Sequence, residues 1–219
     1  MRNNPFRNQE GITLIELLVA FIIFAIASAG SYRLFVAQSK AYTVQDQVIE
    51  IQQNIRTAME ILLMDVRMAG FDSDRPSSKI SINIPLIPGD HSIAVNFEYD
   101  DTTRYTVAYW TDDVTSRLFR QLITTKDDGT SVVGPQCVLL ENVDVFSIVY
   151  GIDDDGAGNQ DGTIDYWEKD STKIGGRRVV SVRLQITAKP EPVTSEVQNM
   201  VSPRILESTV TLRNQCYKF

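Results

Sequence analysis

The sequence predicts an α+β protein in which one long N-terminal helix packs against an antiparallel β-sheet domain. An uncharged apolar run extends from Leu17 to Gly30. No proline interrupts the chain between Ile12 and Ala69, and apolar residues recur at helical spacing up to that point. Beyond Pro76 the sequence changes to short runs of alternating apolar and polar residues, separated by aspartate-rich links, as in antiparallel strands.

The first half of the predicted helix, residues 12–36, is almost entirely apolar and is predicted to span a membrane. About 20 such residues cross a bilayer core of roughly 30 Å. Glu16 is the one acidic residue in this segment, and a charge at the bilayer centre costs roughly 2.5–3.5 kcal/mol. Glu16 is therefore a candidate functional residue. The alternative is that its carboxylate only reaches back to the headgroups near the helix start.

The second half, residues 37–71, is predicted to continue as an amphipathic helix. Its apolar residues step by three or four positions and form one stripe, which comprises Val48, Ile51, Ile55, Met59, Leu62, Val66 and Ala69. Gly70 follows directly and is predicted to end the helix. The stripe provides a packing face for the domain that follows.

Residues 72–219 are predicted to form a β-rich head domain. The run from Val180 to Thr187 alternates apolar and polar residues, which is typical of a half-buried antiparallel strand. Aspartate-rich links at 100–101, 112–113 and 127–129 predict hairpin turns. The predicted strands are 92–98, 104–111, 117–124, 136–140, 143–151, 163–167, 179–188 and 208–213.

A short basic leader, residues 1–11, precedes the apolar helix. A secretory signal carries its cleavage site after the apolar region, whereas here the small residue Gly11 comes before it. The stretch GITLIELLVA from Gly11 to Ala20 resembles the class III signal of type IV pilins and pseudopilins. The resemblance implies that a prepilin peptidase cuts after Gly11 and N-methylates Ile12, where that family usually has Phe.

Cleavage at this position would place a free α-amino group on Ile12, four residues before Glu16 and on the same helix face. The amine and the carboxylate would pair within one subunit, or between neighbouring subunits of a filament. Either arrangement would offset the burial of the carboxylate. In a filament, the pairing between neighbours would set the axial register, so Glu16 is the predicted register residue.

A second resemblance lies at the end of the predicted helix. The segments IQQNIRTAME at 51–60 and DVRMAGF at 65–71 look like the matching region of PilW-type minor pilins. Together the two similarities cover residues 8–71. They imply a pilin-like fold and a minor pilin of a type IV pilus, which acts in pilus assembly with other minor pilins and the major pilin, with a tip adhesin as a further candidate partner. A pseudopilin of a type II secretion system shares the N-terminal signal and is the first alternative.

The charges that flank the apolar run predict its orientation. Arg2 and Arg7 precede it, which favours a cytoplasmic leader and a head on the other side of the membrane. The pilin resemblance implies a single span in inner membrane lipid and a periplasmic head that later joins an extracellular filament. In that oxidising compartment Cys137 and Cys216 are expected to form a disulfide. Two free buried thiols are the alternative.

An acidic loop at residues 153–168 partly matches the calcium-loop pattern. Ala157 occupies the position of the first ligand, but calcium accepts oxygen ligands in flexible geometry, so an aspartate of the preceding turn would take its place. The candidate ligands are Asp153, Asp155, Asn159, Asp161, Asp165 and Glu168. A structural calcium ion is the one cofactor that this pattern suggests, and none is required. The alternative is a solvated hairpin loop, which needs the same residue types.

Several other functions lack the residues they need. The formal net charge is −7 and no basic patch is evident, so no nucleic-acid partner is expected. One histidine, His91, and two cysteines without CxxC spacing do not make a typical zinc site. No Gly-x-Ser-x-Gly elbow is present. We therefore expect that the protein is not an enzyme. A membrane enzyme or a calcium-dependent binding protein with an uncleaved anchor is the alternative from another class.

Overall fold

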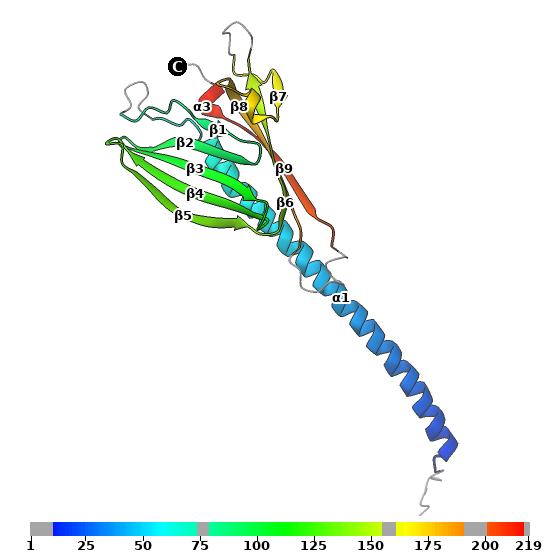
Figure 1. Cartoon of the computed structure of the whole chain (residues 1–219). Helices are drawn as coiled ribbons and strands as arrows, with labels where there is room; N and C mark the ends of the chain where they lie inside the picture. The colour runs from blue at the N-terminus through cyan, green and yellow to red at the C-terminus, as the bar shows by residue number, and fades with distance from the viewer. Residues whose placement is uncertain (1–10, 74–78, 155–160, 191–200, 217–219) are drawn as a thin grey trace, which may run out of the picture. The chain divides into compact units, whose positions relative to one another are not determined.

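The computed structural model describes residues 11–73, 79–154, 161–190 and 201–216. The chain divides into two compact units, Met1–Asp46 and Gln47–Phe219. One helix, α1 (Leu14–Arg67), contributes residues to both units (Figure 1). The predicted long helix is therefore confirmed, with its ends within two or three residues of the expected ones.

In the first unit, α1 is the element that the structure describes, and its apolar side chains are exposed to the surroundings. Gly30 lies within the helix without breaking it, and a Cβ at this position would meet nothing within 4 Å. Of the described helices, α1 alone is long and apolar enough to cross a membrane.

In the second unit, α1 buries one face. The predicted stripe is confirmed from Ile51 to Ala69, whereas Val48 at its start is half-buried and its neighbour Gln47 is buried. The helix ends at Arg67, and Gly70 follows with a φ of +73°, a left-handed conformation that glycine adopts without strain. A Cβ there would lie 2.2 Å from the Gln215 side chain, so Gly70 also permits close packing against the C-terminal segment.

Five strands form the first sheet, an antiparallel meander in the order β1-β2-β3-β4-β5. Its strands are β1 (Leu86–Pro88), β2 (Ser92–Asp100), β3 (Thr103–Asp112), β4 (Arg117–Lys126) and β5 (Ser131–Leu140). The hairpin turns lie at the three predicted aspartate-rich links. In them, Asp100, Asp112 and Asp128 each accept a hydrogen bond from the backbone N–H two residues on.

Four antiparallel strands form the second sheet, in the order β7-β6-β8-β9. They are β6 (Val143–Asp153), β7 (Tyr166–Glu168), β8 (Arg178–Ala188) and β9 (Arg204–Thr211). A short 3₁₀ helix, η1 (Ser171–Lys173), precedes β8, and a four-residue helix, α3 (Arg213–Cys216), follows β9.

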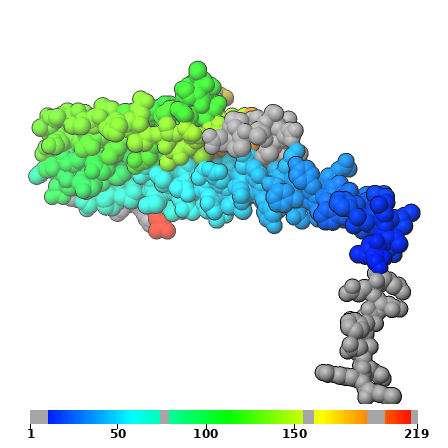
Figure 2. Space-filling view, turned by 90° about the horizontal axis from the view of Figure 1, so that it is seen from below, coloured from blue at the N-terminus to red at the C-terminus, as the bar shows by residue number. Residues whose placement is uncertain are grey.

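Both sheets and the C-terminal part of α1 share one hydrophobic core. Ile55, Leu62 and Val66 of the helix meet Val107 of the first sheet and Ile148 of the second in this core. Figure 2 shows the cyan part of α1 packed lengthwise along the green strands. Burial of the apolar stripe is thus what joins helix and sheets into one unit.

The structure differs from the sequence-based expectation in several respects. Strand β1 (Leu86–Pro88) was not expected, and β7 begins at Tyr166 rather than at residue 163. The head contains two sheets rather than one. Strand β5 begins at Ser131, five residues before the expected start, because it continues through Gly134 and Pro135, residues that usually end strands. Strand β9 begins at Arg204 and ends at Thr211, so Arg213 belongs to α3 rather than to a strand.

Candidate functional site

At the start of α1, Thr13 and Glu16 form reciprocal hydrogen bonds. The Thr13 backbone N–H donates to Glu16 Oε2 at 2.9 Å, and the Thr13 hydroxyl donates to the same oxygen at 2.9 Å. The Glu16 N–H in turn lies 3.3 Å from Thr13 Oγ1. This is a capping box, in which Thr13 is the N-cap and Glu16 occupies the third helical position.

The capping box gives Glu16 a partner that the sequence analysis missed. The signal was present, because a Thr followed three residues later by Glu, directly before an apolar run, is the sequence pattern of this motif. The carboxylate accepts the Thr13 N–H and the Thr13 hydroxyl accepts the Glu16 N–H, two N–H groups that have no acceptor within the helix. Glu16 therefore has a local hydrogen-bonding role in a single subunit, before any filament contact is considered.

The predicted cleavage site lies immediately before this box. Gly11, Ile12 and Thr13 are exposed and precede the first residue of α1, with Ile12 81% exposed. Residues 1–10 of the leader lie outside the described part of the chain. The peptide bond between Gly11 and Ile12 is therefore in an accessible, non-helical segment, as proteolysis requires.

The acidic loop does not bring its predicted ligands together in the part of the chain that is described. Asp153 is fully buried at the end of β6, where its Oδ2 lies 3.5 Å from Nη1 of Arg178 and accepts the Gly162 N–H at 2.9 Å. Its other oxygen, Oδ1, has no hydrogen-bond partner in the described structure. Asp155 and Asn159 lie outside the described residues.

The remaining candidate ligands bind nearby groups. Asp161 accepts hydrogen bonds from Thr163, and Asp165 accepts one from the Asp154 N–H at 2.6 Å. Among the described residues, no three acidic, histidine or cysteine side chains are grouped as a metal site requires. Calcium binding by this loop therefore stays a prediction.

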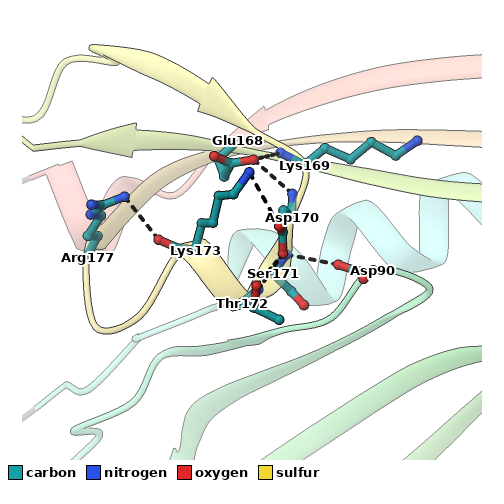
Figure 3. A network of polar contacts seen from close by, with 8 residues as sticks. All are labelled: Asp90, Glu168, Lys169, Asp170, Ser171, Thr172, Lys173 and Arg177. Carbon is teal, nitrogen blue, oxygen red and sulfur yellow. Dashed lines mark hydrogen bonds and ion pairs between the residues drawn. The ribbon is translucent and has the colours of Figure 1, made fainter.

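Glu168 belongs to a polar network that links the two sheets (Figure 3). Its Oε1 accepts the backbone N–H groups of Lys169 and Asp170 at 2.9 and 3.0 Å. Asp170 caps η1 by accepting from the Thr172 N–H, and Asp90, in the turn before β2, accepts the Ser171 N–H at 2.9 Å. Glu168 thus has a structural role at the end of β7.

Cys137 is one of the two residues of the predicted disulfide. This residue is exposed and free on β5, opposite Arg120 of β4. The Cys216 side chain is not among those described. A Cys137–Cys216 bond in the mature protein stays a prediction.

A partly buried polar cluster joins α1 to the first sheet, and the sequence analysis did not find it. The Tyr109 hydroxyl of β3 donates to Asp65 of α1, and Arg120 of β4 lies 3.0 Å from the same Asp65 oxygen. Burial raises the pKa of Tyr109, and the hydrogen bond to the Asp65 carboxylate adds to that rise. The three residues are far apart in sequence, so only the sheet register brings them together.

Residues 6–32 match the family model of the prokaryotic N-terminal methylation motif. This match covers the last six residues of the leader, the cleavage position, the capping box and the apolar part of α1 up to Tyr32. The N-terminal region is therefore type IV pilin-like.

One curated relative supports the same conclusion. The chain is 28% identical over 86 residues to the pilin-like protein PilA3 of Thermus thermophilus, an alignment that covers 38% of this chain and 37% of the relative. No solved structure matches the chain. The similarity supports a pilin-like protein, and the fold, a long apolar helix followed by antiparallel sheets, agrees with it.

Proposed function

We propose that this protein is a minor pilin of a type IV pilus, processed by a prepilin peptidase between Gly11 and Ile12. One observation carries the proposal: the methylation motif, residues 6–32, includes the start of an exposed apolar helix whose only acidic residue in the span is Glu16. A helix with no protein partner for its apolar surface needs lipid or other helices around it. A pilin subunit meets both in turn, first in the inner membrane and then in the filament.

In this proposal the capping box and the free amine of Ile12 act on the same carboxylate. In the membrane, Glu16 is satisfied by Thr13 within the subunit. During assembly, the methylated Ile12 amine of a neighbouring subunit approaches Glu16, because an opposite charge in a low-dielectric medium is strongly attracted. This contact fixes the axial register between subunits.

The head domain provides the contacts to partners. After export it lies in the periplasm and then in the extracellular filament, where other minor pilins, the major pilin and a tip adhesin are the proposed partners. The resemblance of the helix segments 51–60 and 65–71 to PilW-type proteins supports a role in the initiation of pilus assembly.

A pseudopilin of a type II secretion system is the second candidate, because the N-terminal signal is the same in both systems. A membrane-anchored calcium-dependent binding protein is a third, favoured only by the acidic loop with its buried Asp153. The methylation motif argues against the third, since an uncleaved anchor needs no such signal.

Mass spectrometry of the intact protein from native membranes, with and without the prepilin peptidase, tests the proposal. We expect a mature chain that starts at Ile12 and carries one methyl group only when the peptidase is present. Gly11→Leu should block processing, since the bulky side chain replaces the small residue at the cut. Gly30→Ala is the matched control, because its added Cβ meets nothing. A chain that still starts at Met1, or that is cut beyond Gly30, would overturn the proposal.

A further inference from the structure

The face of α1 that follows its apolar run carries two cations and no acid. Arg33 and Lys40 are the only charged residues between Glu16 and Asp46. At 100° per residue they lie on one side of the helix, together with Tyr32, Val36 and Ala37. Among the described residues, these five line a shallow hollow of about 290 Å³ within the first unit.

The position of this face along the helix matches the edge of a bilayer. The rise from Leu14 to Arg33 is about 28 Å at 1.5 Å per residue, close to a hydrocarbon thickness of roughly 30 Å. With the helix start at one boundary, Tyr32 and Arg33 therefore lie at the opposite one. Tyr32, 69% exposed, has the amphipathic ring that is enriched at membrane interfaces.

The direction of the side chains reinforces the match. Cα–Cβ bonds in a helix tilt toward its N-terminus, so Arg33 and Lys40 extend back toward the apolar segment. Long basic side chains on such a helix place their charge at headgroup level while their methylene groups lie along the apolar surface. The same face continues into the apolar span through Ala29, Ile26 and Ile22, which provides a surface for an acyl chain.

We propose that Tyr32, Arg33 and Lys40 form a binding site for the headgroup of an anionic phospholipid. The inference rests on the proposed function, because it requires α1 to cross the membrane. Two cations beside an apolar surface complement a phosphate joined to an acyl chain. The site selects anionic over zwitterionic lipid and holds the subunit at one depth before it is extracted into a filament.

Lipid counting by native mass spectrometry tests the site. The full chain is inserted in nanodiscs of phosphatidylcholine and phosphatidylglycerol at a ratio of about 3:1, released in mild detergent, and the retained lipids are counted. Each basic residue near an anionic surface contributes about 1 kcal/mol, or about fivefold in affinity. We therefore expect phosphatidylglycerol to be enriched at least about threefold over its share, and the double variant R33Q/K40Q to lose that enrichment.

Two controls separate the possible outcomes. R56Q removes an exposed cation of the same helix in the second unit and should leave the enrichment unchanged. Resistance of each variant to alkaline carbonate extraction shows whether the helix is inserted. A chain that is inserted but shows no phosphatidylglycerol enrichment overturns this inference alone. The same holds if R33Q/K40Q keeps the enrichment but is no longer incorporated into filaments. That result would assign the face to contact with an acidic neighbouring subunit. A chain that carbonate extracts overturns the membrane span and the lipid site together.

Discussion

At the scale of single residues, the most informative side chains form hydrogen bonds with polar groups that would otherwise be left without a hydrogen-bond partner in the folded chain or in the membrane. Glu16 and Thr13 close the first turn of α1. Asp65 accepts hydrogen bonds from Tyr109 and Arg120 across the interface between helix and sheet. Both contacts involve a carboxyl group, and hydrogen bonds to an ionised carboxylate are stronger than those between neutral groups.

The capping box predicts the effect of substituting Thr13. Thr13→Ala removes the hydroxyl that accepts the Glu16 N–H, and loss of an N-cap typically costs about 1 kcal/mol. We expect amide hydrogen exchange in the first turn of α1 to become about fivefold faster in detergent micelles. Thr13→Ser keeps the hydroxyl and should exchange as the unsubstituted protein does. Equal exchange in all three proteins would show that the box contributes nothing measurable.

Two buried tyrosines predict how the stability of the head depends on alkaline pH. Burial raises the pKa of Tyr109, and it raises the pKa of Tyr150 as well, from the ordinary value of 10.0. Below about pH 10 both tyrosines are protonated in the folded and the unfolded chain, and their stabilising contribution is complete. Above it the unfolded chain loses protons that the folded head retains, so the free energy of unfolding falls as pH rises.

Urea denaturation, followed by tryptophan fluorescence of the full chain in micelles between pH 8 and 11, measures this slope. Tyr150→Phe should make the slope shallower because it removes one of the two titrating groups. Tyr99→Phe changes an exposed tyrosine and serves as the matched control. A slope that Tyr150→Phe leaves unchanged would assign the alkaline loss of stability to other groups.

At the scale of elements, α1 has two surfaces with different requirements. Its N-terminal part exposes apolar side chains on all sides, whereas its C-terminal part buries one stripe under two sheets. The turn between β1 and β2 is tied to the second sheet through Tyr150, whose hydroxyl donates to the Gly89 carbonyl at 2.8 Å and accepts the Gly89 N–H at 3.0 Å. Together with the bond from Ser171 to Asp90, this contact joins the two sheets at one end.

The buried stripe predicts a large cost for truncation of Leu62. This side chain is 0% exposed at the centre of the core, so Leu62→Ala should lower the free energy of unfolding of the head by about 2–5 kcal/mol. Met64→Ala, on the same helix but 65% exposed, should change it by less than about 0.5 kcal/mol. Chemical denaturation of the full chain in micelles distinguishes them. Similar values for the two variants would mean that the stripe does not pack as described.

At the scale of the whole molecule, the chain combines an apolar anchor with an acidic head. Among the acidic residues of the head that the structure describes, Asp153 has a fully buried side chain, and its Oδ1 has no hydrogen-bond partner there. Burial of a charge without full compensation is destabilising. A cation at this position would supply the missing partner.

The hypothesis of a structural calcium ion predicts a shift in the melting temperature of the head. Addition of millimolar calcium should raise the Tm and give a binding heat by calorimetry, because a ligand that binds only the folded state stabilises it. Asp153→Asn should abolish the calcium-dependent part of the shift, whereas Asp101→Asn in an exposed hairpin turn should preserve it. No heat and no shift would establish the loop as a solvated hairpin.

Much of the fold could be predicted from the sequence because it depends on local pattern. The span of α1, its buried stripe, its end near Gly70 and the three aspartate hairpins follow from the spacing of apolar residues and from turn chemistry. The Thr13–Glu16 box is equally local, since both residues lie within one helical turn, and the pattern was sufficient to find it. The methylation motif is a contiguous stretch and needed no tertiary information.

The sequence by itself determined that this protein has a membrane-type helix with a pilin-like N-terminus and a β-rich head. Only the tertiary structure decided that the head is divided into two sheets, that β5 continues through Gly134 and Pro135, and that Asp65 meets Tyr109 and Arg120. The physical reason is the distance along the sequence between the residues that interact. A helix and its cap are specified by residues a few positions apart, whereas strand partners and buried polar contacts depend on which distant segments the core brings together.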